Sequence, residues 1–158
     1  MTTNESSRDV ASVERLIAAP AEAIFALLAD PSRHCDFDGS GTVRAADESR
    51  QLALGDVFGM SMKMGVGYRM VNTVVEFEEN RRIAWQPQPD VKFMRALAGG
   101  RIWRYELEPR DGGTLVRESW DIHQERFPFM VRPMKSKTVA AMTATLERLA
   151  KLVEAPAG

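Results

Sequence analysis

The stretch Val13–Pro31, VERLIAAPAEAIFALLADP, decides how the N-terminal part of the chain folds. Apolar residues recur at alternate positions through residues 10–18, which predicts a strand. Ala19-Pro20 then opens a helix, because proline suits the first helical position. Asp30-Pro31 ends this helix, since proline pushes the preceding residue out of the α region, and the same pair can begin a second short helix with Asp30 as its cap. The stretch therefore predicts one strand followed by two short helices.

Six further strands and a final helix follow this opening. The strands are predicted over residues 42–46, 56–65, 68–77, 82–85, 101–108 and 114–122. Tight turns such as Asp111-Gly112-Gly113 connect the middle strands, so we expect an antiparallel sheet. Residues 136–153 keep apolar side chains at a 3.6-residue spacing, which predicts a long amphipathic helix. The order indicates an α+β domain whose curved sheet wraps around this helix, a packing that leaves room for a ligand.

Length and charge narrow the class of protein. The 158 residues match one domain spanning 1–158, and we expect a flexible arm at 1–8 and a tail at 154–158. Hydrophobic residues make up 44% and charged residues 27%, which is typical of a folded, water-exposed chain. The net charge of −1 argues against nucleic-acid binding, because binding to a phosphate backbone needs a basic surplus.

Cysteine count and motifs exclude several kinds of site. Cys35 is the single cysteine, so no internal disulfide can form and a zinc site built on cysteines is excluded, which fits a cytoplasmic location. Residues 1–10 lack the apolar core of a signal peptide, and no apolar stretch is long enough for stable membrane insertion. The sequence has no phosphate-binding loop and no dinucleotide fingerprint, so we expect no cofactor.

The opening stretch resembles a known family. A strand that ends in Ala19-Pro20, a helix rich in aromatic and aliphatic residues and a following Asp30-Pro31 are similar to the start of the START-like, or Bet v 1-like, superfamily. More narrowly, they resemble the bacterial SRPBCC members described as polyketide cyclase/dehydrase and lipid transport, and the order of elements extends the resemblance over about residues 9–153. The resemblance implies a helix-grip fold, with a seven-stranded antiparallel sheet around the last helix and a deep apolar cavity between them. It brings no catalytic residue.

Methionine and aromatic side chains are the candidate ligand contacts. Methionine is flexible and polarizable, so a row of methionines suits a cavity that accepts varied shapes, but the same row also fills gaps in an ordinary core. Tryptophan and tyrosine on neighbouring strands either clamp a ligand or pack the core. The predicted ligand-binding residues are Phe58, Met60, Met62, Met64, Met70, Trp85, Trp103, Tyr105, Glu118, Trp120, Met142 and Leu146.

Glu118 is the polar member of this set. It lies between Val116 and Trp120 on the predicted inward face of its strand, where a carboxylate is costly unless it is paired or protonated. Tyr105 and Arg104 on the neighbouring strand are its candidate partners, with Arg101 as another. Glu118, Tyr105 and Arg104 are therefore the candidate catalytic residues, for anchoring a head group or moving protons. In the alternative register, Glu118 faces solvent.

Three loops are candidates for the rim of the cavity or for a lid over it. His34, Asp36 and Asp38 match no standard metal-ligand spacing, so we expect a polar loop at the mouth of the cavity and no metal site. The apolar loops 86–100 and 124–135 have the length of lids over a pocket. Alternatively, each forms a short helix packed on the rim, or residues 127–134 make a dimer contact.

These patterns leave three hypotheses about function. The leading one is binding or transport of a small hydrophobic ligand, such as a lipid, an isoprenoid or a polyketide-like molecule, by a monomer or homodimer. The second is a polyketide cyclase or dehydratase acting on a poly-ketone in the same cavity. The third is a protein-interaction module without a ligand, acting through residues 127–134.

Overall fold

The computed structural model describes residues 2–46, 50–95 and 99–154, without the side chains of residues 2–7, 45 and 64. Its strands are β1 (Thr2–Ser7), β2 (Val10–Ile17), β3 (Val43–Ala46), β4 (Val57–Met64), β5 (Val66–Glu78), β6 (Arg82–Pro89), β7 (Ile102–Arg110) and β8 (Gly113–Asp121). Its helices are α1 (Ala21–Leu28), η1 (Pro31–Arg33), α2 (His34–Phe37), α3 (Lys92–Arg95), α4 (Pro128–Val131), η2 (Arg132–Met134) and α5 (Lys135–Val153).

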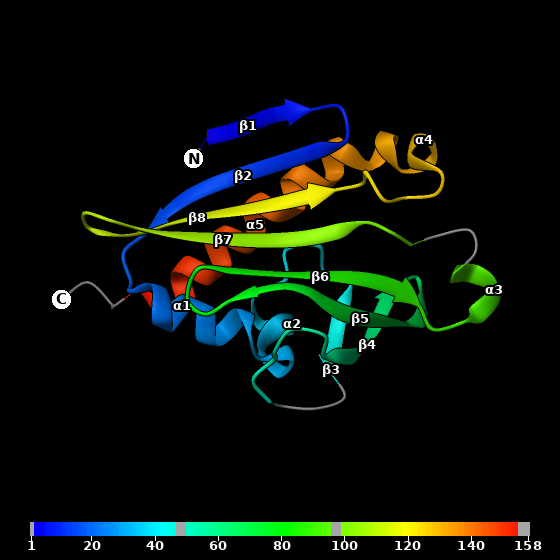
Figure 1. Cartoon of the computed structure of the whole chain (residues 1–158), viewed down its shortest axis with the longest axis horizontal. Helices are drawn as coiled ribbons and strands as arrows, with labels where there is room; N and C mark the ends of the chain where they lie inside the picture. The colour runs from blue at the N-terminus through cyan, green and yellow to red at the C-terminus, as the bar shows by residue number, and fades with distance from the viewer. Residues whose placement is uncertain (1, 47–49, 96–98, 155–158) are drawn as a thin grey trace.

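All the strands belong to one antiparallel sheet in the order β1-β2-β8-β7-β6-β5-β4-β3. The seven predicted strands are present as β2 to β8, and the sheet curves around α5 (Figure 1). The α+β helix-grip architecture is therefore confirmed. Residues 2–7, where we expected part of a flexible arm, form β1 and pair with β2, which adds an eighth strand at the edge. The predicted tail falls mostly on residues 155–158, outside the described part of the chain.

The two short helices after β2 follow from the local sequence as predicted. Pro20 immediately precedes α1, which buries Ile24 and Leu28 against the core. Asp30 caps η1, because its side chain accepts a hydrogen bond of 3.0 Å from the backbone N–H of Ser32, and Pro31 occupies the first position. The Asp30 cap therefore begins η1, which leads directly into α2.

The long helix α5 fills the concave side of the sheet. Its buried residues are Thr138, Met142, Thr145, Leu146, Leu149 and Ala150. They pack into one core with β2, β7, β8 and α1, and fully burying a leucine or methionine contributes about 1.5–3 kcal/mol. The apolar stripe predicted for residues 136–153 is thus the stripe that holds the helix in the sheet. No helix among the described residues is both long and apolar enough to cross a bilayer.

β6 runs further than the sequence led us to expect. We predicted that it ends at Trp85, before Pro87 and Pro89, but it continues to Pro89. Beyond Trp85 it pairs with β5 alone, so this part of β6 is an edge with no ladder on its other side. Proline lacks an N–H and is tolerated in such an edge. The chain then enters α3, and the second predicted loop contains α4 and η2, so both loops form short helices.

Candidate ligand-binding site

A pocket of about 130 Å³ lies between the inner face of the sheet, the segment from α2 to β3, and α5. Side chains from β4, β6, β7 and β8 form one wall, and α5 forms the opposite wall. The lining residues are His34, Phe37, Asp38, Ser40, Thr42, Val43, Met60, Met62, Trp85, Trp103, Tyr105, Glu118, Ala141, Met142 and Thr145. The walls are therefore mainly aromatic and sulfur-containing, with a few polar groups.

Glu118 and Tyr105 form a buried polar pair in this wall. They sit directly opposite each other on β8 and β7, and the Tyr105 hydroxyl donates a hydrogen bond of 2.8 Å to Oε1 of Glu118. The pKa of Glu118 is raised to about 8, chiefly by burial; the Tyr105 hydrogen bond lowers it and nearby Asp38 raises it, and the value already includes both. Burial, together with Glu118, holds the pKa of Tyr105 well above its ordinary value. Both groups are therefore mainly neutral near pH 7.

The second carboxyl oxygen of Glu118, Oε2, is available for a hydrogen bond to a ligand. Oε2 is buried and has no hydrogen-bond partner within the described structure. Because Oε1 accepts the hydrogen bond from the Tyr105 hydroxyl, the carboxyl proton of neutral Glu118 belongs on Oε2. A buried donor without an acceptor costs about 1–3 kcal/mol. A ligand that offers an acceptor atom at this position removes the penalty.

His34 is one of the pocket residues that come from outside the sheet. Its Nε2 lies 2.8 Å from the carbonyl oxygen of Leu28, so Nε2 carries the hydrogen and Nδ1 is left as an acceptor. The imidazole stacks on Trp85, with 4.7 Å between ring centroids and 21° between planes, and meets the rings of Phe37 and Phe58 at 5.3 and 5.6 Å. Burial lowers the pKa of His34 to about 4, so the ring is neutral at pH 7.

The segment after α2 gives the pocket a polar rim. The Asp38 carboxylate accepts hydrogen bonds from the backbone N–H groups of Ser40 and Val43, both at 3.1 Å. The N–H of Gly39 donates to Oγ1 of Thr145 on α5 at 2.9 Å. These bonds fix the rim against α5. Of the three loop residues considered for a polar cluster, His34 and Asp38 line the pocket, while Asp36 is exposed.

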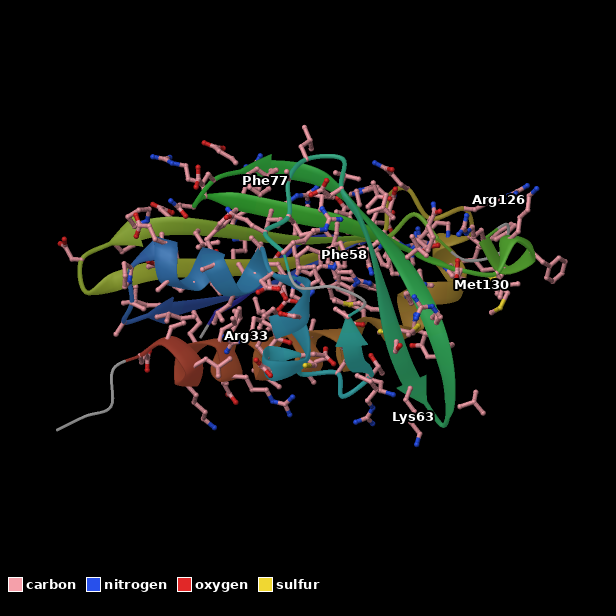
Figure 2. All side chains as sticks on the ribbon, turned by 90° about the horizontal axis from the view of Figure 1, so that it is seen from below. Arg33, Phe58, Lys63, Phe77, Arg126 and Met130 are labelled. Carbon is pink, nitrogen blue, oxygen red and sulfur yellow. The ribbon has the colours of Figure 1, made fainter. Side chains whose placement is uncertain are left out.

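Seven of the predicted ligand contacts line the pocket, and four others whose side chains the structure describes do not. Those in the lining are Met60, Met62, Trp85, Trp103, Tyr105, Glu118 and Met142. Phe58, Trp120 and Leu146 are buried in the core behind it, and Met70 is half-buried outside it; Figure 2 labels Phe58 near the middle of the molecule. The side chain of Met64 lies outside the described part of the structure. Alternation along a strand predicts which face of the sheet a side chain lies on. It does not predict whether another element packs on that side chain or leaves it at the pocket.

Arg104 does not partner Glu118, contrary to our expectation. Its guanidinium faces the outer side of the sheet, where it donates to the Glu76 carboxylate at 2.6–3.0 Å and lies 3.5 Å from Asp121. Successive residues of a strand face opposite sides, so Arg104 cannot share a face with Tyr105. Arg101, the other candidate, pairs with Glu125 at 2.8 Å.

Sequence reasoning assigned no pocket role to several lining residues, and placed His34 only at the rim. Phe37, Ser40, Thr42 and Val43 come from the segment between α2 and β3, whose path depends on tertiary packing. Ala141 and Thr145 flank Met142 on α5, and their helical spacing was a usable signal.

Residues 8–154 match the family described as polyketide cyclase / dehydrase and lipid transport, which covers nearly the whole chain. The chain belongs to this family. Within the polyketide cyclase / dehydrase and lipid transport family, one curated relative is the uncharacterized protein Rv0088 of Mycobacterium tuberculosis, 36% identical over 110 residues. The match takes in 68% of this chain and 45% of that protein, so the chain spans about half the length of the curated relatives it matches.

Solved structures of other proteins share the fold of this member of the polyketide cyclase / dehydrase and lipid transport family. A Rhodobacter sphaeroides protein superposes with a TM-score of 0.73 at 16% identity, covering 96% of this chain and 95% of that one. DynU16, a protein of the dynemicin biosynthetic locus, superposes with a TM-score of 0.64 at 14% identity, covering 90% of this chain and 46% of its own. At such identities the likeness shows the fold alone.

Proposed function

We propose that the protein binds a small, mainly apolar molecule that offers one hydrogen-bond acceptor, such as a carbonyl oxygen, to Oε2 of Glu118. The observation that carries this proposal is a buried carboxyl, paired to Tyr105 through one oxygen and unpartnered at the other, in a wall of aromatic and methionine side chains. The apolar wall supplies affinity and the carboxyl proton supplies orientation. We also propose that the protein acts in the cytoplasm, as expected from the sequence.

Pocket size limits the ligand. Typical pockets for drug-sized ligands have volumes of about 300–1,000 Å³, and an engineered cavity of about 150 Å³ is known to hold benzene. The 130 Å³ present here suits one ring or a short chain, in contrast to the deep cavity implied by the resemblance. Three methionines, Met60, Met62 and Met142, line it, and this side chain changes shape at low cost, so larger ligands enter by moving them.

The test compares two ring compounds with the same carbon skeleton, acetophenone and ethylbenzene, of which only the first has an acceptor oxygen. We expect acetophenone to raise the melting temperature more than ethylbenzene, and Glu118→Leu to abolish the difference. Glu106→Leu is the matched control, because Glu106 lies on the outer face of the same sheet. Equal shifts for the two compounds, or no shift with either, would overturn the proposal. Native mass spectrometry of the purified protein would then identify any apolar adduct carried from the cell.

A second candidate function, a polyketide cyclase or dehydratase, is favoured by the same pair of residues. A carboxyl whose pKa is about 8 holds its proton at neutral pH and can donate it to a substrate carbonyl or hydroxyl as a general acid. The Glu118→Gln variant separates the two functions, since glutamine still donates a hydrogen bond but has no acidic proton to transfer. Turnover of an aromatic poly-ketone that survives in Glu118→Gln would contradict the enzymatic role and leave the binding role intact.

A further inference from the structure

Two short apolar segments, residues 91–95 and 127–134, lie outside the pocket lining at one end of the molecule. Figure 1 shows α3 and α4 at the same end, and Figure 2 places Arg126 and Met130 at that end as well. The large side chains exposed there are Val91, Phe93, Met94, Phe129, Met130 and Met134, which we call the end patch. Phe93 is 76% exposed and Phe129 is 65% exposed, far more than is usual for phenylalanine.

The two segments are fixed to each other by buried and half-buried polar groups. The Glu125 carboxylate accepts hydrogen bonds from Nε of Arg101 at 2.8 Å and from the N–H of Gly99 at 3.4 Å. Nε2 of Gln86 donates to the carbonyl oxygen of Gly100 at 3.0 Å and to the side chain of Gln124 at 3.2 Å. The end patch is therefore presented by a framework that joins both segments. Large apolar side chains that are exposed together at one end of a protein are typical of an interaction site.

Charge indicates the partner. Residues 90–101 and 124–137 together contain seven lysines and arginines and two acidic residues, in a chain whose net charge is −1. Asp90 pairs with Arg95 at the surface, Glu125 pairs with Arg101, and Arg132 pairs with Asp9, so the basic residues remain in excess over the acidic ones at this end. A second copy meeting this end with its own end patch would bring like charges together. Exposed aromatic and methionine side chains in two segments rich in basic residues match an anionic membrane surface, where apolar groups enter the headgroup region and cations remain at the phosphates.

We propose that the end patch docks on the surface of an anionic lipid bilayer. The contact is peripheral, with Phe93 and Phe129 entering the interface while Lys92 and Lys137 contribute to the positive field around them. The proposal rests on a surface distinct from the ligand pocket and needs no ligand in it.

Co-sedimentation with vesicles tests the proposal on the full chain. We expect binding to vesicles of phosphatidylcholine with phosphatidylglycerol, none to phosphatidylcholine alone, and a loss of binding at high salt. The double substitution Phe93→Ser and Phe129→Ser should weaken binding about tenfold or more, and Lys92→Glu with Lys137→Glu should do the same. Leu54→Ser and Lys151→Glu are matched controls, because both residues are exposed elsewhere on the molecule.

Two outcomes would overturn the proposal. One is wild-type protein that does not sediment with anionic vesicles, and the other is loss of binding in the controls as in the end-patch variants. Size-exclusion chromatography tests the competing case, in which the end patch binds a second copy of the chain. A wild-type dimer that becomes a monomer in the double serine variant, combined with no binding to vesicles, would assign the end patch to dimer formation. The acetophenone thermal shift should be unchanged in the serine variant, so a failed docking test and a failed pocket test are distinguishable.

Discussion

The Tyr105 hydroxyl and the Glu118 carboxyl face each other directly across β7 and β8, 2.8 Å apart, deep in the inner face of the sheet. The two largest effects on Glu118 in this position oppose each other. Burial favours the protonated acid, while the hydrogen bond from Tyr105 favours the carboxylate, and burial is the stronger. The pair therefore keeps a proton at neutral pH inside an otherwise apolar pocket.

Removing the Tyr105 hydroxyl should make the Glu118 carboxyl a weaker acid. In Tyr105→Phe, we expect the pKa of Glu118 to rise above about 8, because the lost hydrogen bond favoured the carboxylate. The free energy of unfolding should fall by about 1–3 kcal/mol, since Oε1 loses its partner. Carbon-13 NMR titration of the carboxyl and urea unfolding measure the two effects. Tyr68→Phe, at a more exposed position, is the control, and an unchanged or lowered carboxyl pKa would contradict the assignment.

Glu118 should make the protein less stable in alkali. Its pKa is about 8 in the folded state and 4.5 in the unfolded chain, so between these values the folded state holds a proton that the unfolded state has lost. The contribution of Glu118 to the free energy of unfolding is fully present below pH 4.5 and is lost as the pH rises through 8. The free energy of unfolding falls by at most about 1.4 kcal/mol per pH unit in this range. Urea unfolding from pH 6.5 to 9 should show the decline in wild type and not in Glu118→Gln. A decline that persists in that variant would assign it to another group.

His34 should act in the opposite direction at lower pH. Its pKa is about 4 when folded and 6.5 when unfolded, so its stability contribution is present above 6.5 and is lost as pH falls through 4. Between pH 4.5 and 6.5 this effect offsets that of Glu118. Glu118→Gln should therefore reveal a rise in stability from pH 4 to 6.5, and adding His34→Gln should flatten it. Adding the exposed His123→Gln instead should leave the rise in place.

Gly39 should tolerate no side chain. A Cβ there would lie 2.6 Å from the backbone nitrogen of Thr145 and would also overlap the carbonyl oxygen of Ala141, both on the α5 backbone. Gly39→Ala should lower the free energy of unfolding by about 2 kcal/mol or more and displace the polar rim of the pocket. Gly41→Ala, where nothing lies within 4 Å but φ is +73°, should cost only about 1 kcal/mol of backbone strain. Equal losses in the two variants would contradict the packing argument.

Arg104 should be dispensable for the pocket. It lies on the outer face in ion pairs with Glu76 and Asp121, so Arg104→Gln should leave the acetophenone thermal shift and the Glu118 pKa unchanged. The pairs are partly exposed, and their loss should cost about 1 kcal/mol or less of stability. A thermal shift abolished by Arg104→Gln would mean that the outer face controls the site.

Much of the fold followed from local patterns. Alternation on β7 and β8 placed Tyr105 and Glu118 on one face, and the turn at Asp111-Gly112-Gly113 set the register that makes them opposite. Proline and aspartate before α1 and η1 positioned both short helices. The extension of β6 through Pro87 was not predictable in this way, because it depends on β7 leaving that edge unpaired.

The sequence by itself therefore determined the order of elements and which residues of each strand share a face, because strand and helix periodicity are properties of neighbouring residues. Which of the two faces is buried, and with it the buried position of Glu118, was left open by the sequence and decided by the packing of the sheet. Only the tertiary structure decided that His34 stacks on Trp85, that the segment from Asp38 to Val43 closes the pocket, and that its volume is about 130 Å³. These features join residues far apart in the chain. They depend on how α2 and α5 pack against a curved sheet, which no local pattern specifies.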